Sequence, residues 1–173
     1  SVQGNGEDTV EGMLIGMTCA TGETCSRTLT SGSSVSLRAI PSAGSFFAGW
    51  SGACADGGSS CSLTMSSAQT VQATFTRYAT LTVARAGDGV GYISGNEGIL
   101  CPIDCSEDFV PGTTVMLSAI ASTGSSFDSW SGVCAGQGHI CEVTLTESQS
   151  VTASFRTNPT DDDGDDDGGG GNT

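Results

Sequence analysis

The chain has 173 residues, of which 26 are Gly, 8 are Cys and only 14% are charged. It carries 19 acidic residues against 5 basic ones, all of them Arg, and its net charge is −14. Nucleic acids and anionic membranes bind basic surfaces, so this charge argues against both classes of partner. No run of 18 apolar residues occurs, and the sequence therefore predicts no membrane-spanning helix.

The sequence contains two tandem copies of one repeat unit. A shift of 80 residues aligns the two copies without a gap over 51 positions, starting at Cys25 and Cys105, with 23 identities. Self-similarity of this kind indicates tandem structural units. We therefore divide the chain into a first repeat at residues 1–77, a second repeat at 78–157 and an Asp/Gly-rich linker or tail at 158–173.

In chain order, apolar and polar residues alternate along 35–39, 63–65, 71–75, 81–83 and 151–155. Strict alternation places successive side chains on opposite faces, which is typical of a half-buried strand. Gly-rich joints separate these segments, and no stretch has the 3.6-residue period of a helix. The sequence predicts an all-β fold with two tandem units of short antiparallel strands.

The eight cysteines form four pairs that are close in the sequence: Cys19 and Cys25, Cys54 and Cys61, Cys101 and Cys105, Cys134 and Cys141. Four cysteines in each repeat allow three connectivities. We favour the local one, because each pair brackets a short Gly/Ser-rich loop. A zinc site is the rival interpretation, but the spacings do not match the usual zinc ribbons and no His recurs between the copies. Disulfides predict a secreted, extracellular or cell-surface location.

Each repeat also carries an aromatic pair with the same spacing, Phe47 with Trp50 and Phe127 with Trp130. Their recurrence beside a cysteine favours a position in the core, where all four residues would act as anchors. The alternative is that exposed Trp rings stack on sugars, as in a carbohydrate-binding module.

A shared motif runs through both copies: Trp-Ser-Gly-x-Cys at 50–54 and 130–134, followed by Val-x-Ala-x-Phe at 71–75 and 151–155. With these motifs, residues 2–156 resemble the divergent internalin-type B repeat of bacterial secreted and surface proteins. The resemblance implies a compact β-rich module, β-grasp-like or a small sandwich, that is strung in tandem on extracellular proteins. The motif of this family includes no catalytic residues, so the resemblance implies no enzymatic activity.

The first repeat differs from the second at its start. In the second repeat the strand at 78–83 precedes a Gly-rich turn, whereas in the first repeat the matching turn is already at 4–6. The equivalent strand would therefore lie mostly before Ser1. Either the chain is a fragment of a longer protein, or a neighbouring chain supplies the strand to an exposed sheet edge.

Candidate catalytic and metal-binding residues are few. The only His, His139, lies in a Gly-rich loop and has Ser59 as its counterpart, so we expect no catalytic role for it. In the tail, Asp163, Asp165 and Asp167 match the start of a calcium loop, although the closing bidentate acid is absent. The alternative for this tail is a flexible acidic linker. Calcium is the one cofactor that the sequence suggests.

These inferences predict a non-enzymatic extracellular structural or adhesion repeat protein at the bacterial surface. The expected partners are other copies of the chain or surface proteins, with glycans as a further candidate. A subunit of an extracellular filament assembled through edge strands is the sharpest form of this hypothesis. The alternative is a carbohydrate-binding accessory module of a secreted hydrolase.

Overall fold

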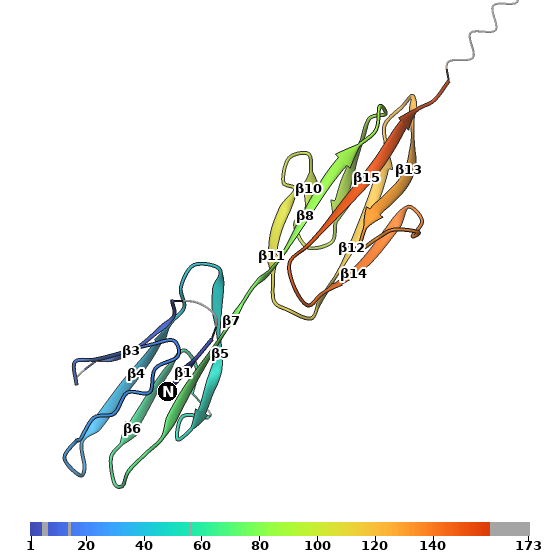
Figure 1. Ribbon diagram of the computed structural model, residues 1–173. Coiled ribbons are helices and arrows are strands. Elements are labelled where there is room, and N and C mark those ends of the chain that lie inside the picture. Colours follow the sequence, from blue (N-terminus) through green and yellow to red (C-terminus); the bar gives the residue numbers. More distant parts are fainter. Residues whose placement is uncertain (5–6, 14, 56, 160–173) are drawn as a thin grey trace, which may run out of the picture. The chain divides into compact units, whose positions relative to one another are not determined.

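The computed structural model describes residues 1–4, 7–13, 15–55 and 57–159. These residues form fifteen strands and no helix, which confirms the all-β prediction (Figure 1). Within the described part of the chain there is accordingly no helix that could cross a membrane.

The first repeat has two sheets, with the strand orders β1-β7-β5 and β3-β2-β4-β6. Its strands are β1 (Val2–Gln3), β2 (Thr9–Gly12), β3 (Met17–Ala20), β4 (Ser34–Ile40), β5 (Ser45–Gly52), β6 (Ser60–Thr64) and β7 (Val71–Arg77). One pairing differs from the predicted antiparallel strands, because β1 runs parallel to β7. Parallel strands need a long connection. Here the connection between β1 and β7 includes all the strands of the other sheet.

The second repeat also has two sheets, with the orders β11-β8-β15-β13 and β10-β9-β12-β14. Its strands are β8 (Ala79–Ala86), β9 (Gly91–Gly95), β10 (Leu100–Cys101), β11 (Ser106–Phe109), β12 (Thr113–Ala121), β13 (Ser125–Gly132), β14 (Ile140–Leu145) and β15 (Gln149–Thr157). By sheet position β8 corresponds to β1, β15 to β7 and β13 to β5. Among the described residues of the first repeat, no strand corresponds to β11.

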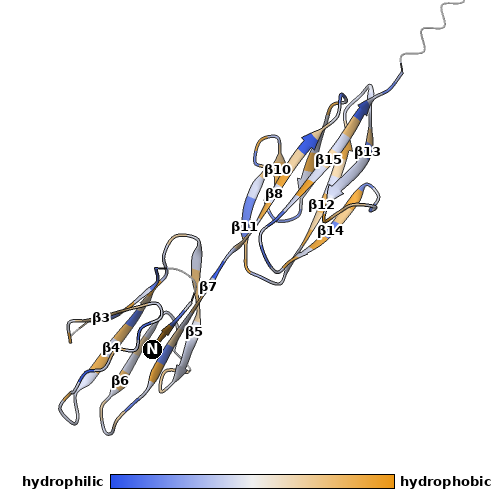
Figure 2. Ribbon diagram, in the orientation of Figure 1, coloured by the Kyte–Doolittle hydropathy of each residue, from blue (hydrophilic) through white to orange (hydrophobic). Residues whose placement is uncertain are grey.

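Alternating apolar residues build the core of each repeat. In β4 the inward residues Val35, Leu37 and Ala39 are buried, and the residues between them are more exposed. They belong to one cluster with buried residues from β1, β2, β5 and β7, so both sheets of the first repeat contribute to one apolar layer. Such a layer makes the repeat a small sandwich, and Figure 2 shows apolar residues along the strands of both repeats.

Four disulfides join cysteines that are close in the sequence: Cys19–Cys25, Cys54–Cys61, Cys101–Cys105 and Cys134–Cys141. The structure therefore has the local connectivity among the three that each repeat allowed. No cysteine in the described residues is free, which leaves no thiolate for zinc. Each bridge closes a small loop and stabilises the fold by about 2 kcal/mol in the chain-entropy model.

Candidate functional site

The recurring aromatic pairs lie in the two cores. Trp50 is 7% exposed and Trp130 is 3% exposed, while Phe47 and Phe127 are half-buried. The ring centroids are 5.1 Å apart in the first pair and 5.7 Å apart in the second. Burial of both indoles leaves no open ring face on which a sugar could stack. The carbohydrate-binding alternative thus loses the feature on which it depended.

His139 is exposed in its loop, and its ring lies beside Phe127 with the centroids 4.9 Å apart. Its main-chain carbonyl accepts a hydrogen bond from the Ala119 N–H at 3.0 Å, which extends the β12–β14 ladder. In the described part of the chain, the imidazole itself makes no hydrogen bond. The contacts of His139 are those of a packed loop residue.

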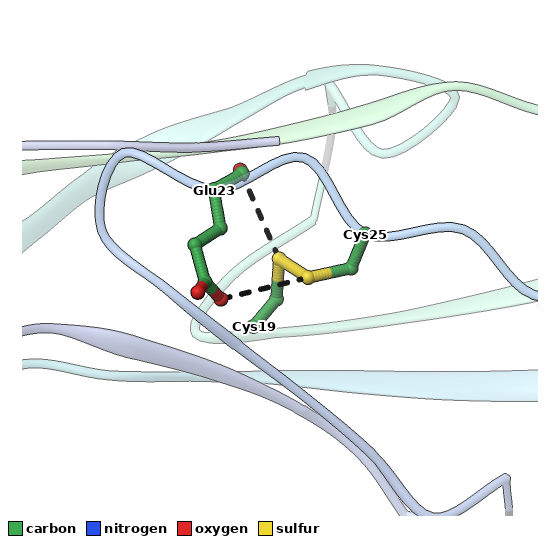
Figure 3. Close-up of side chains that lie close together, drawn as sticks. All are labelled: Cys19, Glu23 and Cys25. Atoms are coloured by element: carbon green, nitrogen blue, oxygen red, sulfur yellow. Dashed lines mark hydrogen bonds between the residues drawn. A yellow bond between two sulfur atoms is a disulfide. The ribbon is translucent and has the colours of Figure 1, made fainter.

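Cys19, Glu23 and Cys25 bring three potential metal ligands together (Figure 3). The Cys19 Sγ lies 3.8 Å from the Glu23 carbonyl oxygen, and the Cys25 Sγ lies 3.8 Å from Glu23 Oε2. The two sulfurs form a disulfide, however, and only a thiolate is a metal ligand. Glu23 Oε2 instead accepts a hydrogen bond from the Ala20 N–H at 3.0 Å, so this carboxylate closes the disulfide loop.

The three tail residues proposed as calcium ligands, Asp163, Asp165 and Asp167, lie outside the described residues. Calcium binding by this segment therefore stays a prediction from the sequence.

Asp8 is a buried carboxylate that no motif or periodicity of the sequence indicates. It has no exposed surface, and its Oδ1 accepts hydrogen bonds from the Ser42 N–H at 2.8 Å, the Ser42 hydroxyl at 3.0 Å and the Ser45 hydroxyl. Oδ2 is buried and has no partner among the described residues. Burial raises the pKa of Asp8, but the hydrogen bonds from Ser45 and Ser42 and the charge of Arg77 outweigh it and hold the pKa below its ordinary value.

The duplication could not reveal this residue. The pairing of β2 with β4 and of β9 with β12 makes Gly91 the counterpart of Asp8. At Gly91 a Cβ would lie 2.4 Å from the Phe155 ring, so the second repeat fills with an aromatic ring the space that a side chain would need. Asp8 is therefore specific to the first repeat.

An apolar cleft of about 430 Å³ opens between the sheets of the first repeat. Its lining comes from both sheets and includes Val2, Val10, Leu37, Trp50, Leu63 and Met65. Ser1 and Val71 line the same cleft at the start of β1 and β7, and Arg27 contributes a charged side chain. The cleft is the candidate binding site of the described residues, because it combines apolar walls with a sheet edge.

Comparison with known protein families agrees with the duplication. The family model for the divergent InlB B-repeat domain matches residues 16–79 and again residues 81–159. The two matches together cover most of the chain and confirm the family resemblance drawn from the Trp-Ser-Gly-x-Cys and Val-x-Ala-x-Phe motifs. A search of curated proteins gives no match to the chain.

Proposed function

Because the chain belongs to the divergent InlB B-repeat family, whose domains are typical of bacterial surface proteins, we propose that it is a non-enzymatic structural and adhesive module outside the bacterial cell. The main support for this proposal is the architecture of each repeat, which is a small two-sheet sandwich with two local disulfides. Small extracellular domains depend on such bridges, because their cores alone supply little stability.

The location can be tested on intact cells that express the native protein. We expect an antibody against the two repeats to label the cell surface or the medium, and external protease to remove the label. In the same fractions all eight cysteines should resist a thiol reagent until a reductant is added. Detection only in the cytosol, with reactive thiols, would contradict the proposal.

In its more specific form, the proposal is that the chain is a subunit of an extracellular filament, in which neighbouring subunits are joined through their sheet edges. An unpaired edge offers N–H and C=O groups to another strand, and the outer strands β5 and β6 of the first repeat each pair with a described strand on one side only. Negative-stain electron microscopy of native material, with and without calcium, tests this form directly. Continuous fibres would support a filament subunit, whereas discrete particles would restrict the role to a stalk or adhesion module.

A glycan array distinguishes this proposal from a carbohydrate-binding accessory module. Because Trp50 is buried, its ring cannot contact a glycan directly. We therefore expect that Trp50→Ala does not abolish the binding of any glycan in a protein that remains folded. Selective loss of glycan binding in a folded Trp50→Ala protein would instead support the accessory-module function.

A further inference from the structure

The strand β6 has one side on which its backbone has no partner. It pairs with β4 and with no other described strand. The Met13 N–H donates a hydrogen bond to the Ser36 carbonyl at 3.1 Å, so the backbone groups of Ser36 face β2. Ser62 lies opposite Ser36. Because bonded and non-bonded pairs alternate along an antiparallel ladder, the Ser62 N–H and C=O point away from β4, and among the described residues no hydrogen bond satisfies them.

In the second repeat a side chain covers the same position. The counterpart of Ser62 is Glu142 in β14. The Glu142 N–H donates a hydrogen bond to Gln137 Oε1 at 2.9 Å, and Gln137 Nε2 donates to the Glu142 carbonyl at 3.2 Å. One side-chain amide thus occupies both backbone groups, as a neighbouring strand would. The counterpart of Gln137 is Gly57, which makes the same turn bond to the first cysteine of its loop but has no side chain to cover the edge.

The other edge strands of four or more residues also have features that oppose pairing. β5 and β13 each contain a β-bulge, which bends the strand. At the end of β3 the Glu23 carboxylate accepts a hydrogen bond from the Ala20 N–H. β11 carries Glu107 and Asp108. Such devices keep sheet edges from pairing with other chains. β6, with the sequence Ser-Cys-Ser-Leu-Thr, has no charge, no Pro and no register shift.

A second copy of β6 fits this edge in one symmetric register. A two-fold axis at Ser62 places this residue opposite its own counterpart, with Ser60 opposite Thr64. These are the residues whose backbone groups point outward, so they can exchange hydrogen bonds across the contact. The same register places Cys61 opposite Leu63, and both side chains lie on the inner face of the sheet. The two faces of the sheet therefore continue from one copy into the other.

Charge also favours a second copy at β6 and opposes one at β14. The chain has a net charge of −14, but residues 57–76 contain no charged side chain. Two copies of β6 therefore meet without repulsion between like charges. The equivalent symmetric contact in the second repeat would place Glu142 directly opposite another Glu142, which is destabilising. The residue at the centre of the contact is thus permissive in one repeat and repulsive in the other.

We propose that β6 pairs antiparallel with β6 of a second copy of the chain, about a two-fold axis at Ser62. The inference rests on the proposed structural role and deepens it, because it names the edge, the partner and the register. A two-fold contact is closed, so it joins chains in pairs, and a fibre would need a second contact as well. A contact through one short strand is small, so the pairing is weak and gains from the high local concentration of chains on one surface.

The mass of the whole chain in solution tests the proposal. We expect sedimentation equilibrium between about 10 μM and about 1 mM to show a mass that rises toward twice that of the chain. The Ser62 amide hydrogen should exchange more slowly as the concentration rises. The Glu142 amide, which Gln137 already occupies, should not change and serves as the internal control. A single mass at every concentration would overturn the proposal and would leave the edge to a strand of a different protein.

Three single variants test the edge and the register. Ser62→Glu gives β6 the residue that β14 has at the equivalent position, so the fold accommodates it, and it should weaken association at least tenfold. Ser62→Pro removes the outward N–H without adding charge, and edge strands tolerate Pro; it should weaken association as well. Ser51→Glu adds the same charge at an exposed position of β5 and should have no effect. Equal weakening by Ser62→Glu and Ser51→Glu, or weakening by Ser51→Glu alone, would overturn the proposal.

The reverse exchange tests whether the two features of β14 prevent pairing. Gln137→Gly combined with Glu142→Ser gives the second repeat the residues of the first at both positions. A chain with two pairing edges should form assemblies larger than a pair at the same concentrations. An unchanged mass would contradict the argument from the edge. These measurements do not depend on where the protein is located, so their failure leaves the surface role to its own test.

Discussion

Phe47 and Trp50 face the same core although they are three residues apart on one strand. Their ring centroids lie 5.1 Å apart, whereas strict alternation would place them on opposite sides of the sheet. The register of β5 with β7 shifts between Phe47 and Gly49, and this β-bulge returns Trp50 to the inner face. The second repeat has the same shift between Phe127 and Ser129. The Phe-x-x-Trp spacing is therefore the sequence signature of a bulge.

Loss of the anchor should unfold the first repeat. Trp50→Ala removes a large buried ring, a change that typically costs 3–5 kcal/mol, roughly the whole stability of a domain this small. We expect the amide NMR signals of the first repeat to collapse into the unfolded range, whereas those of the second repeat persist. Trp50→Phe is the matched control, because it retains an aromatic core residue. A well-folded Trp50→Ala chain would contradict the anchor role.

Much of the strand pattern was predictable from the sequence because those strands have one buried face. The alternation along 35–39, 71–75 and 151–155 lies within β4, β7 and β15. Their inward residues are buried as the pattern requires, down to 0% exposed for Ala73 and Ala153, with the exception of Val71, which is only partly buried. Local alternation is enough in these cases, since the period decides which side chains enter the core.

β11 was not predictable, because its conformation depends on a partner. Ser106–Phe109 lacks an alternating pattern and forms a strand by pairing with β8, with Phe109 opposite Ala79. The equivalent residues 26–29 of the first repeat are not in a strand. The parallel β1–β7 pair and the contacts of Asp8 with Ser42 are likewise set by residues distant in the chain, which a local pattern does not contain.

The buried carboxylate of Asp8 should make the first repeat sensitive to acid. Its pKa is lowered in the fold from the ordinary value of 3.8. The stabilisation is therefore complete above that value and is lost as the pH falls through the lower folded pKa. We expect Asp8→Asn to reduce stability at neutral pH and to flatten its pH dependence in urea unfolding between about pH 5 and pH 2. The exposed control Glu142→Gln should retain the slope, and an unchanged slope in Asp8→Asn would contradict this assignment.

The Gly of the Trp-Ser-Gly motif is required by both backbone conformation and space. Gly52 has a φ of 75°, and a Cβ there would lie 2.3 Å from the Thr70 carbonyl oxygen. Gly132 has a φ of 77° and the same conflict at 2.4 Å with the Ser150 carbonyl oxygen. Gly44 has a similar φ of 77°, but its Cβ position is open.

Gly44→Ala should therefore cost about 1–2 kcal/mol, the strain of the left-handed conformation alone. Gly52→Ala and Gly132→Ala should each cost clearly more, since the backbone must also move. Chemical denaturation of the three single variants measures the difference directly. Equal destabilisation by Gly44→Ala and Gly52→Ala would show that contact with the neighbouring strand does not contribute.

The bridges beside the two Trp residues should contribute more to folding than the bridges near the start of each repeat. Cys54 and Cys61 are 3% and 5% exposed, and Cys134 and Cys141 have no exposed surface, whereas Cys25 is only partly buried. Replacing Cys134 and Cys141 by Ala removes loop closure, worth about 2 kcal/mol, and also buried sulfur packing against the core.

We expect the Cys134→Ala/Cys141→Ala chain to lose more stability than the Cys19→Ala/Cys25→Ala chain, although both loops are of similar length. Thermal unfolding of the two double variants under oxidising conditions provides the comparison. Entropy of loop closure alone predicts nearly equal losses. A larger loss of stability for the buried pair would therefore show that packing contributes the excess. Equal losses would show that the cysteines stabilise the fold by loop closure alone and not by packing in the core.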